Sequence, residues 1–298
     1  MSATVAIVQS GALLFDTPGT LVRALERIAA AAAEGAQIVV FPEAFLGGYP
    51  KGMDFGARVG SRSPEGRHEF RRYFESAVDC LGPETHALAE AARTHGVYLV
   101  MGCVEREKSS LYCSVLFFSP DGKLMGRHRK VMPAAMERLI WSFGDGSTLS
   151  VFDTPYGRLG SVICWENYMP ALRMAMYEQG IQIYCACTVD DRDTWVSTMR
   201  HIAVEGRCFV LSACQYVEGL IRGGSMIVDP LGRVIVEPVY GQETILTAEI
   251  DLRAIAEGKF DLDVVGHYAR PDLFELRVQR APQAPVTYLE GAGDDRED

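Results

Sequence analysis

A basic stripe, long apolar runs and a positively charged leader are all missing from this 298-residue sequence. A nucleic-acid surface needs clustered Lys and Arg to displace counterions, whereas the formal net charge here is −10. No apolar run approaches the length of a membrane span, and no positive segment precedes the first apolar stretch. We therefore expect a soluble, cytoplasmic protein that binds neither nucleic acid nor membrane.

The eight cysteines include no C-x-x-C pair, and most stand in strand-like runs beside Val, Ile and Phe. Cys185 and Cys187 share one face of a predicted strand, but no His or Cys pair near them completes a metal site. In a reducing compartment such residues are more often small core side chains than disulfides or zinc ligands. We expect free, buried cysteines and no bound metal.

The chain also lacks a low-complexity linker that would mark a domain boundary. About a dozen strand-like runs alternate with roughly six or seven helical patterns. This interleaving predicts a single α/β domain over residues 1–279, built as a four-layer α-β-β-α sandwich of two mixed sheets with helices on both outer faces. Residues 280–298 are rich in Pro, Gly and acidic residues, which predicts a flexible tail.

The segment on which the rest of the chain depends lies near its middle. Residues 157–163 are predicted to form a buried strand that ends on Cys164, and the chain then turns into a helix at Pro170, a residue suited to the first helical position. A cysteine at a strand end, followed by backbone N–H groups, mounts a nucleophile and an oxyanion-stabilising donor together. By itself the pattern is not decisive, because inert buried cysteines are common.

A carboxylate occupies another strand end. The apolar run 37–41 leads directly into Pro42 and Glu43, and residues 44–50 are again mostly apolar or aromatic. A solvated loop acid is the alternative, but these neighbours favour burial. A buried carboxylate needs a partner.

Four cationic or titratable residues end the strand predicted over 123–129. Arg127, His128 and Arg129 are expected to form a solvated face. Lys130 differs, because it lies where the strand gives way to an apolar turn, and there it can point inward.

Two predictions concern the second half of the chain. The acids of 190–193 are expected to cap a helix over about 194–205, and the segments 233–237 and 244–250 to pair as a hairpin. The helix carries side chains at a spacing of four, which predicts a core or interface stripe: Trp195, Met199 and Ala203.

Chemistry gives a reason to group the three residues at strand ends. A thiolate is the competent form of the Cys164 nucleophile, and a nearby ammonium such as Lys130 lowers the pKa of a thiol. A carboxylate such as Glu43 accepts the proton. The lysine can then stabilise negative charge that develops on a substrate nitrogen or oxygen.

The segments around these residues resemble the nitrilase superfamily of carbon–nitrogen hydrolases and, within it, the true nitrilase branch. The matches follow the family's order from about Val5 to Arg277, and Cys164 followed by Trp-Glu favours nitrilases over amidase and carbamoylase relatives. The matching segments are 41–45, 128–133, 137–141 leading to 144–146, 164–170, 191–195 and 266–272.

The resemblance implies a hydrolase that acts on carbon–nitrogen bonds other than peptide bonds and needs no cofactor. Cys164 would attack a nitrile carbon, with Glu43 as general base, Lys130 as electrophilic stabiliser and Glu137 as a fourth acid that helps to position the lysine and the substrate. A thioimidate and then a thioester would form on the cysteine, releasing ammonia and finally a carboxylic acid.

Aromatic side chains near the cysteine suggest an aromatic or arylaliphatic nitrile as the small-molecule substrate, although aliphatic and cyano-amino-acid nitriles stay open. The residues expected to wall the substrate pocket are Trp165, Tyr168, Thr188 and Trp195.

Two departures from the family pattern bear on assembly and specificity. Residues 214–224 are short where many nitrilases carry an insertion associated with spiral assembly, which argues against filaments but not against a homodimer or larger homo-oligomer. Cys187 stands where close relatives are expected to have proline, so substrate preference transfers less well.

Three hypotheses follow. The first is a nitrilase that forms acid and ammonia. The second is an amidase or N-carbamoyl hydrolase of the same superfamily, or an enzyme that hydrates a nitrile only to the amide. The third is a binding or assembly protein that has lost turnover, which an intact set of Glu43, Lys130 and Cys164 disfavours.

Overall fold

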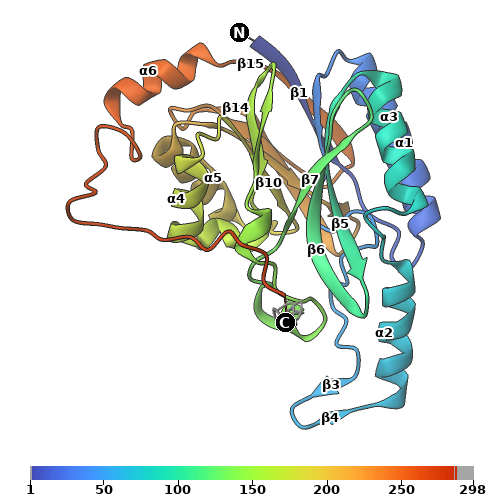
Figure 1. Ribbon diagram of the computed structural model, residues 1–298. Coiled ribbons are helices and arrows are strands. Elements are labelled where there is room, and N and C mark those ends of the chain that lie inside the picture. The colour runs from blue at the N-terminus through green and yellow to red at the C-terminus, as the bar shows by residue number, and fades with distance from the viewer. Residues whose placement is uncertain (1, 285, 287–298) are drawn as a thin grey trace, which may run out of the picture.

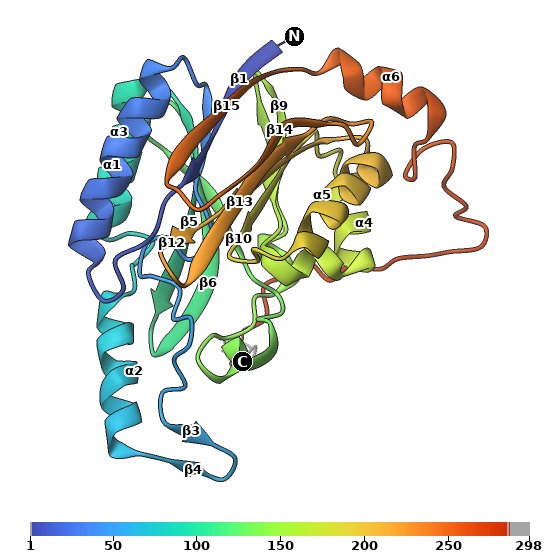
Figure 2. The same cartoon turned by 180° about the vertical axis from the view of Figure 1, so that it is seen from behind.

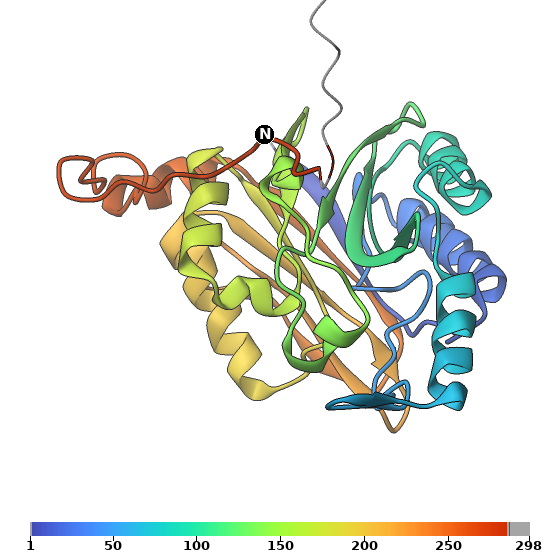
Figure 3. The same ribbon diagram turned by 60° about the horizontal axis from the view of Figure 1, so that its bottom comes forward.

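The computed structural model describes residues 2–284 and 286, and two sheets pack face to face between helices there (Figures 1 and 3). The first sheet has the strand order β15-β1-β2-β5-β6-β7 and the second β12-β13-β11-β10-β9-β8, with β14 paired to β13. Each sheet contains parallel and antiparallel pairs. The predicted four-layer α-β-β-α sandwich is confirmed.

The strands of the first sheet are β1 Ser2–Gln9, β2 Ile38–Val40, β5 Tyr98–Glu107, β6 Ser110–Phe118, β7 Leu124–Arg129 and β15 Thr244–Asp251. Those of the second are β8 Val151–Thr154, β9 Gly157–Ser161, β10 Ile183–Thr188, β11 Phe209–Cys214, β12 Tyr216–Val217, β13 Ile221–Val228 and β14 Val234–Tyr240. A small separate hairpin is formed by β3 Ala57–Arg58 and β4 Ser61–Arg62.

The helices are α1 Thr17–Ala33, α2 Pro64–Ser76, α3 Pro83–His95, α4 Pro170–Glu178, α5 Asp193–Gly206 and α6 Arg253–Asp261. Short 3₁₀ turns are η1 Ala135–Leu139, η2 Gly146–Thr148 and η3 Cys164–Tyr168. Seen from behind, α1 and α3 lie on one outer face of the sandwich and α4 and α5 on the other (Figure 2).

Alternation along the strands creates the layers. Successive side chains of a strand point to opposite faces. In β1, Val5 and Ile7 enter the core between the sheets, whereas Ala6 and Val8 pack in the core that contains Ala24 and Ile28 of α1. Every one of these side chains is fully buried, so β1 is covered on both faces, as its near-continuous apolar sequence requires.

The second sheet is built in the same way. Cys185 and Cys187 of β10 face the core between the sheets, while Tyr184 packs with α4 and α5. The stripe Trp195, Met199 and Ala203 of α5 is buried in that outer core, as predicted. All eight cysteines are free and buried, which confirms the prediction from their spacing.

The predicted hairpin between 233–237 and 244–250 is wrong. β14 pairs with β13, whereas β15 crosses to the first sheet and lies antiparallel to β1, from Ser2 opposite Asp251 to Gln9 opposite Thr244. A short connection with a glycine predicts a turn, but it does not tell which sheet receives the second strand.

The predicted cap of α5 is also wrong. Its N-cap residue is Arg192, which makes no side-chain capping hydrogen bond. Asp190 instead pairs with the guanidinium of Arg192 and accepts a hydrogen bond from the Trp165 indole, 3.0 Å away. Asp190 also accepts the backbone N–H of Arg192 at 3.1 Å, but this residue precedes the first helical position, so the bond caps none of the free N–H groups of α5.

Beyond α6 the chain runs in an extended path back across α4 (Figure 1). Most of the predicted tail, 280–298, lies outside the described residues. Within the described part of the chain, no helix is both long and apolar enough to cross a membrane.

Candidate active site

The backbone at Cys164 is more strained than a plain strand end. β9 ends at Ser161, two residues before the predicted end, because Cys164 opens the 3₁₀ turn η3. Val162 still donates a backbone hydrogen bond to Cys185 of β10 (3.0 Å), so the approach to the cysteine is held by the sheet. Cys164 itself has φ of 48°, a left-handed conformation that non-glycine residues rarely adopt. The side chain is placed by a sharp turn at the sheet edge.

Glu43 and Lys130 meet from the first sheet. Lys130 follows β7 directly, Glu43 follows β2, and both are fully buried. The Lys130 Nζ lies 2.5 Å from Oε1 of Glu43. The other carboxylate oxygen of Glu43, Oε2, is buried without a hydrogen-bond partner among the described residues. That oxygen is therefore free to take a proton from a group in the cavity.

Glu137, in η1, gives Lys130 a second carboxylate. Its Oε2 lies 2.8 Å from Lys130 Nζ and also accepts the backbone N–H of Ala134 at 2.6 Å. Its Oε1 accepts a hydrogen bond from the Tyr49 hydroxyl at 2.7 Å. The ammonium is thus held between two acids whose own orientations are fixed.

Burial and charge set the proton affinities of the site. Burial raises the pKa of Glu43 to about 7, even though the Lys130 ammonium acts to lower it. Burial and the Glu43 charge hold the pKa of the Cys164 thiol well above its usual value, against the effect of Lys130. Burial acts to lower the pKa of Lys130, but the charges of the groups around it, Glu43 first among them, together outweigh burial and hold that pKa well above its usual value. The thiol therefore needs a base, and Glu43 can act as one near neutral pH.

A cavity of about 310 Å³ opens onto the cysteine. Its lining includes Cys164, Glu137 and several side chains that the sequence analysis did not single out. The lining residues are Tyr49, Lys51, Ala134, Ala135, Met136, Glu137, Cys164, Trp165, Val189, Asp190, Asp191 and Arg192. This volume is at the lower end for small-molecule sites.

The four predicted pocket residues have different surroundings. Trp165 lines the cavity, with the Arg192 guanidinium 4.9 Å from its ring centroid. Thr188, Tyr168 and Trp195 are not among the lining residues of the described cavity. Thr188 is fully buried at the end of β10, and the Trp195 indole donates to Ser212 Oγ at 2.8 Å within the outer core.

Several residues of the site were missed by the sequence reasoning. Tyr49 and Met136 carried no motif of their own, although Tyr49 stands in the aromatic run after Glu43 and Met136 next to Glu137. Gln215, after β11, donates to the backbone carbonyl of Glu43 at 2.7 Å. Cys113 of β6 places its Sγ 3.5 Å from Oε1 of Glu43. These contacts come from other strands, so only the folded structure reveals them.

The expected solvated face at the end of β7 is wrong for two of its three residues. His128 is 1% exposed and pairs with the buried Glu166. Arg129 binds the buried Glu105 and its guanidinium lies over the Tyr112 ring. A charged side chain can point inward where a buried carboxylate is available as its partner. A run of charged residues in the sequence does not show whether such a partner exists.

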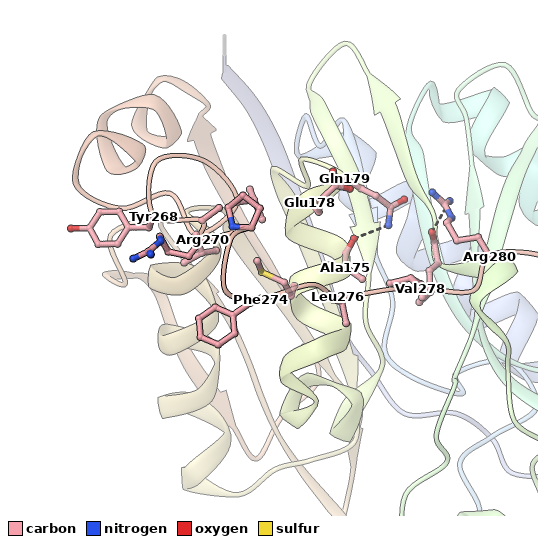
Figure 4. A pocket seen from close by; sticks show the side chains of 15 residues that line it. Ala175, Glu178, Gln179, Tyr268, Arg270, Phe274, Leu276, Val278 and Arg280 are labelled. Atoms are coloured by element: carbon pink, nitrogen blue, oxygen red, sulfur yellow. Dashed lines mark hydrogen bonds between the residues drawn. The ribbon is translucent and has the colours of Figure 1, made fainter.

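A larger cavity, of about 560 Å³, lies elsewhere. The extended segment after α6 forms it with α4, from Tyr268, Phe274 and Leu276 on one side and Ala175 and Gln179 on the other (Figure 4). Its walls are mostly apolar and hold neither Cys nor Lys. Size alone would mislead here, because the titratable groups converge on the smaller cavity.

The residue types around Cys164 do not suggest a metal. Within the described part of the chain, no group of three or more His, Cys, Asp or Glu side chains is arranged to hold a metal ion. The polar groups of the site are instead matched to one another as acid, ammonium and thiol.

Known proteins resemble this chain in sequence and in fold. The family model for carbon–nitrogen hydrolases matches residues 4–260. The chain is 53% identical to an aliphatic nitrilase of Sinorhizobium fredii, covering 94% of this chain and 97% of that protein. It is 50% identical to a bifunctional nitrilase/nitrile hydratase of Nicotiana tabacum, covering 95% and 87%.

Among solved structures, Nit3 of Saccharomyces cerevisiae, described as a member of branch 10 of the nitrilase superfamily, superposes with a TM-score of 0.72. It is 26% identical in sequence, and the match covers 90% of this chain and 96% of that one. The chain therefore belongs to the carbon–nitrogen hydrolase family and, within the nitrilase superfamily, to the true nitrilase branch, whose members hydrolyse carbon–nitrogen bonds other than peptide bonds.

Proposed function

We propose that this enzyme hydrolyses an organic nitrile to a carboxylic acid and ammonia through a covalent intermediate on Cys164. One observation carries the proposal: a thiol, an ammonium and a carboxylate with a free oxygen come together at one buried site, beside a small cavity. The nitrilase relatives support the choice of substrate class.

The first step forms the carbon–sulfur bond. As Cys164 Sγ adds to the nitrile carbon, Glu43 takes the thiol proton and passes it to the nitrile nitrogen, whose developing negative charge Lys130 stabilises. The product is a thioimidate. Because the thiol has a raised pKa, proton transfer to Glu43 accompanies the attack rather than preceding it.

Two waters complete the reaction. The first adds to the thioimidate carbon, with Glu43 as base, and ammonia leaves, which gives a thioester. The second hydrolyses the thioester, releases the acid and returns the proton to the sulfur. Glu137 and Tyr49 keep the Lys130 ammonium in place during these steps.

Hydration to the amide is the second candidate. After the first water adds, expulsion of the thiol in place of ammonia gives an amide from the same tetrahedral intermediate. A relative with 50% identity is named a bifunctional nitrilase/nitrile hydratase, which favours testing this branch.

Product analysis tests both candidates. The protein is incubated with aliphatic, arylaliphatic, aromatic and cyano-amino-acid nitriles and with the matching amides and N-carbamoyl compounds, and ammonia, acid and amide are quantified by mass. We expect acid and ammonia from at least one nitrile, and a loss of at least about 10³-fold in Cys164→Ala. The matched control is Cys208→Ala, a cysteine of the outer core. Equal activity in Cys164→Ala, or turnover of amides alone, would refute the proposal.

We also propose that the protein works as a homodimer or larger homo-oligomer. The family resemblance supports this, as do the exposed apolar side chains of the extended segment, among them Tyr268, Phe274 and Leu276. Light scattering coupled to size-exclusion chromatography measures the mass directly, and a monomer at all concentrations would contradict the proposal.

A further inference from the structure

Glu166 contacts the backbone next to both Lys130 and Cys164. Its side chain is fully buried, in η3. Oε1 accepts the N–H of Val131, the residue after Lys130, at 2.6 Å. Oε2 accepts the N–H of Ile163, the residue before Cys164, at 2.8 Å. A single carboxylate thus ties the segment that carries the lysine to the segment that carries the cysteine.

His128 completes this arrangement from β7. Its Nε2 lies 2.9 Å from Oε2 of Glu166, and its Nδ1 lies 3.3 Å from the backbone carbonyl of Thr148. Both ring nitrogens therefore face acceptor oxygens, and His128 contacts Glu166 on one side and the Thr148 carbonyl on the other. The histidine fixes the orientation of the carboxylate, and the loop at Thr148 fixes the histidine.

The two segments that Glu166 joins belong to different sheets. Lys130 follows β7 of the first sheet, and its backbone N–H donates a hydrogen bond to the backbone carbonyl of Cys113 at 2.8 Å. Cys164 follows β9 of the second sheet and has a left-handed backbone conformation. Such a conformation is strained in a non-glycine residue, so contacts from the surrounding structure must maintain it. Since the nucleophile and the ammonium come from separate sheets, their relative position depends on contacts that cross between them.

We propose that Glu166, held by His128, is a positioning residue that sets the geometry of Cys164 relative to Lys130. It does not touch the cavity, and no step of the reaction passes through it. The inference rests on the proposed role of Cys164 as nucleophile, but the position of the thiol can be measured without any nitrile.

Glutamine cannot replace this glutamate, although it has the same shape. Each carboxylate oxygen accepts a backbone N–H. Whichever way the amide of Glu166→Gln is turned, its NH₂ group faces one of those N–H donors, so one tie becomes a repulsive contact.

The first experiment compares Glu166→Gln with a matched control, Glu243→Gln. Glu243 also accepts a backbone N–H, from Gly11 at 3.2 Å, and pairs with Arg27 on the α1 side of the molecule. We measure kcat and KM on the nitrile found above, thermal unfolding, and the alkylation rate of each cysteine by iodoacetamide from peptide masses. Glu166→Gln is expected to lower kcat by about 10²-fold, the effect of a displacement of roughly 1 Å, with KM within about threefold.

The alkylation rate gives a readout that does not need turnover. Glu166→Gln should change the rate at Cys164 by at least about tenfold while the other seven cysteines keep their rates, and Glu243→Gln should leave all eight unchanged. If the wild type hydrolyses no nitrile, the proposed function fails, and the alkylation comparison still decides the positioning role.

A second pair of variants protects the test against misfolding of Glu166→Gln. In His128→Gln the side-chain amide nitrogen takes roughly the place of Nε2 and can still donate to Glu166, whereas in His128→Asn it takes roughly the place of Nδ1 and cannot. We expect His128→Gln to keep kcat within about fivefold and His128→Asn to lose at least about tenfold, at similar melting temperatures. A folded Glu166→Gln with wild-type kcat and alkylation, or equal activity in the two histidine variants, would overturn the proposal.

Discussion

Two buried glutamates, Glu43 and Glu166, contact the segment around Lys130, and they differ in how many of their carboxylate oxygens are hydrogen-bonded. Glu43 contacts the ammonium through Oε1 and leaves Oε2 without a partner among the described residues. Glu166 contacts the backbone N–H of Val131 and of Ile163, so that both of its oxygens are bonded. A buried acceptor left without a partner costs about 1–3 kcal/mol, so this oxygen of Glu43 needs an explanation, and a role as proton acceptor supplies one.

The comparison separates a reacting acid from a positioning acid. An acid that must take a proton needs an oxygen that is not already committed, and its proton affinity must lie near the working pH. The Glu43 site meets both conditions, because burial raises its pKa to about 7. An acid that holds the backbone needs all its bonds made. The predictions below test this contrast, from the largest effect to the smallest.

Replacing Lys130 with Met should have the largest effect. The ammonium lies between Glu43 and Glu137, so Lys130→Met leaves two buried acids without a counter-charge. Removal of one partner of a buried ion pair lowers the free energy of unfolding by about 3–5 kcal/mol. We expect kcat to fall at least about 10³-fold and chemical denaturation to show the loss of stability.

The double variant Lys130→Met/Glu43→Gln provides the control. It should regain part of the lost stability because one buried acid is now neutral, while activity stays absent. A double variant no more stable than Lys130→Met alone would show that the charges of Glu43 and Lys130 are not coupled.

Glu43→Gln comes next. The amide oxygen can still accept a hydrogen bond from Lys130, so folding and melting temperature should change little. The base is gone, and kcat/KM should fall by about 10²–10⁴-fold. Steady-state kinetics on the chosen nitrile measure this, and a variant within a few-fold of wild type would mean that another group takes the proton.

The pH profile tests Glu43 without a mutation. A base works in its deprotonated form, so kcat/KM should rise with pH through about 7, and this limb should vanish in Glu43→Gln. Stability shifts the other way. Because the folded state binds this proton more tightly than the unfolded chain, whose Glu pKa is about 4.5, the contribution of Glu43 to the free energy of unfolding is full below that pH and is lost as the pH rises through about 7.

Tyr49→Phe should have the smallest effect. It removes the hydroxyl that donates to Oε1 of Glu137, one step away from Lys130. A single hydrogen bond contributes about 0.5–1.5 kcal/mol, which corresponds to at most about a tenfold loss in kcat. Tyr73→Phe is the control, since that hydroxyl donates to the backbone of Gly48, and it should affect stability but not kcat. Equal kcat losses in both variants would remove Tyr49 from the site.

The layers of the fold were predictable because they depend on local patterns. Near-continuous apolar runs such as 37–41 predicted strands covered on both faces, and that is how β2 lies. The sheet that each strand joins was not predictable. For example, β15 pairs with β1, which lies near the opposite end of the sequence. Only long-range packing decides that partner.

The site residues also fall into those that the sequence predicted and those that it did not. Glu43, Lys130 and Cys164 were singled out because each follows a strand, and the structure brings Glu43 and Lys130 into contact beside the cysteine. The burial of His128 was missed because its partner, Glu166, is 38 residues away and acts on the backbone. A run of charged residues in the sequence does not show which of these residues has a buried hydrogen-bond acceptor as its partner.

The central claim is that Cys164 carries the substrate. The most direct measurement is the mass of peptides from the protein quenched during turnover of a nitrile, with Glu43→Gln used to slow release of the adduct. The account predicts the mass of the nitrile, or of its acyl group, on the peptide that contains Cys164 and on no other. Acid formation with Cys164 unmodified at every time point, or an adduct on another of the eight cysteines, would contradict it.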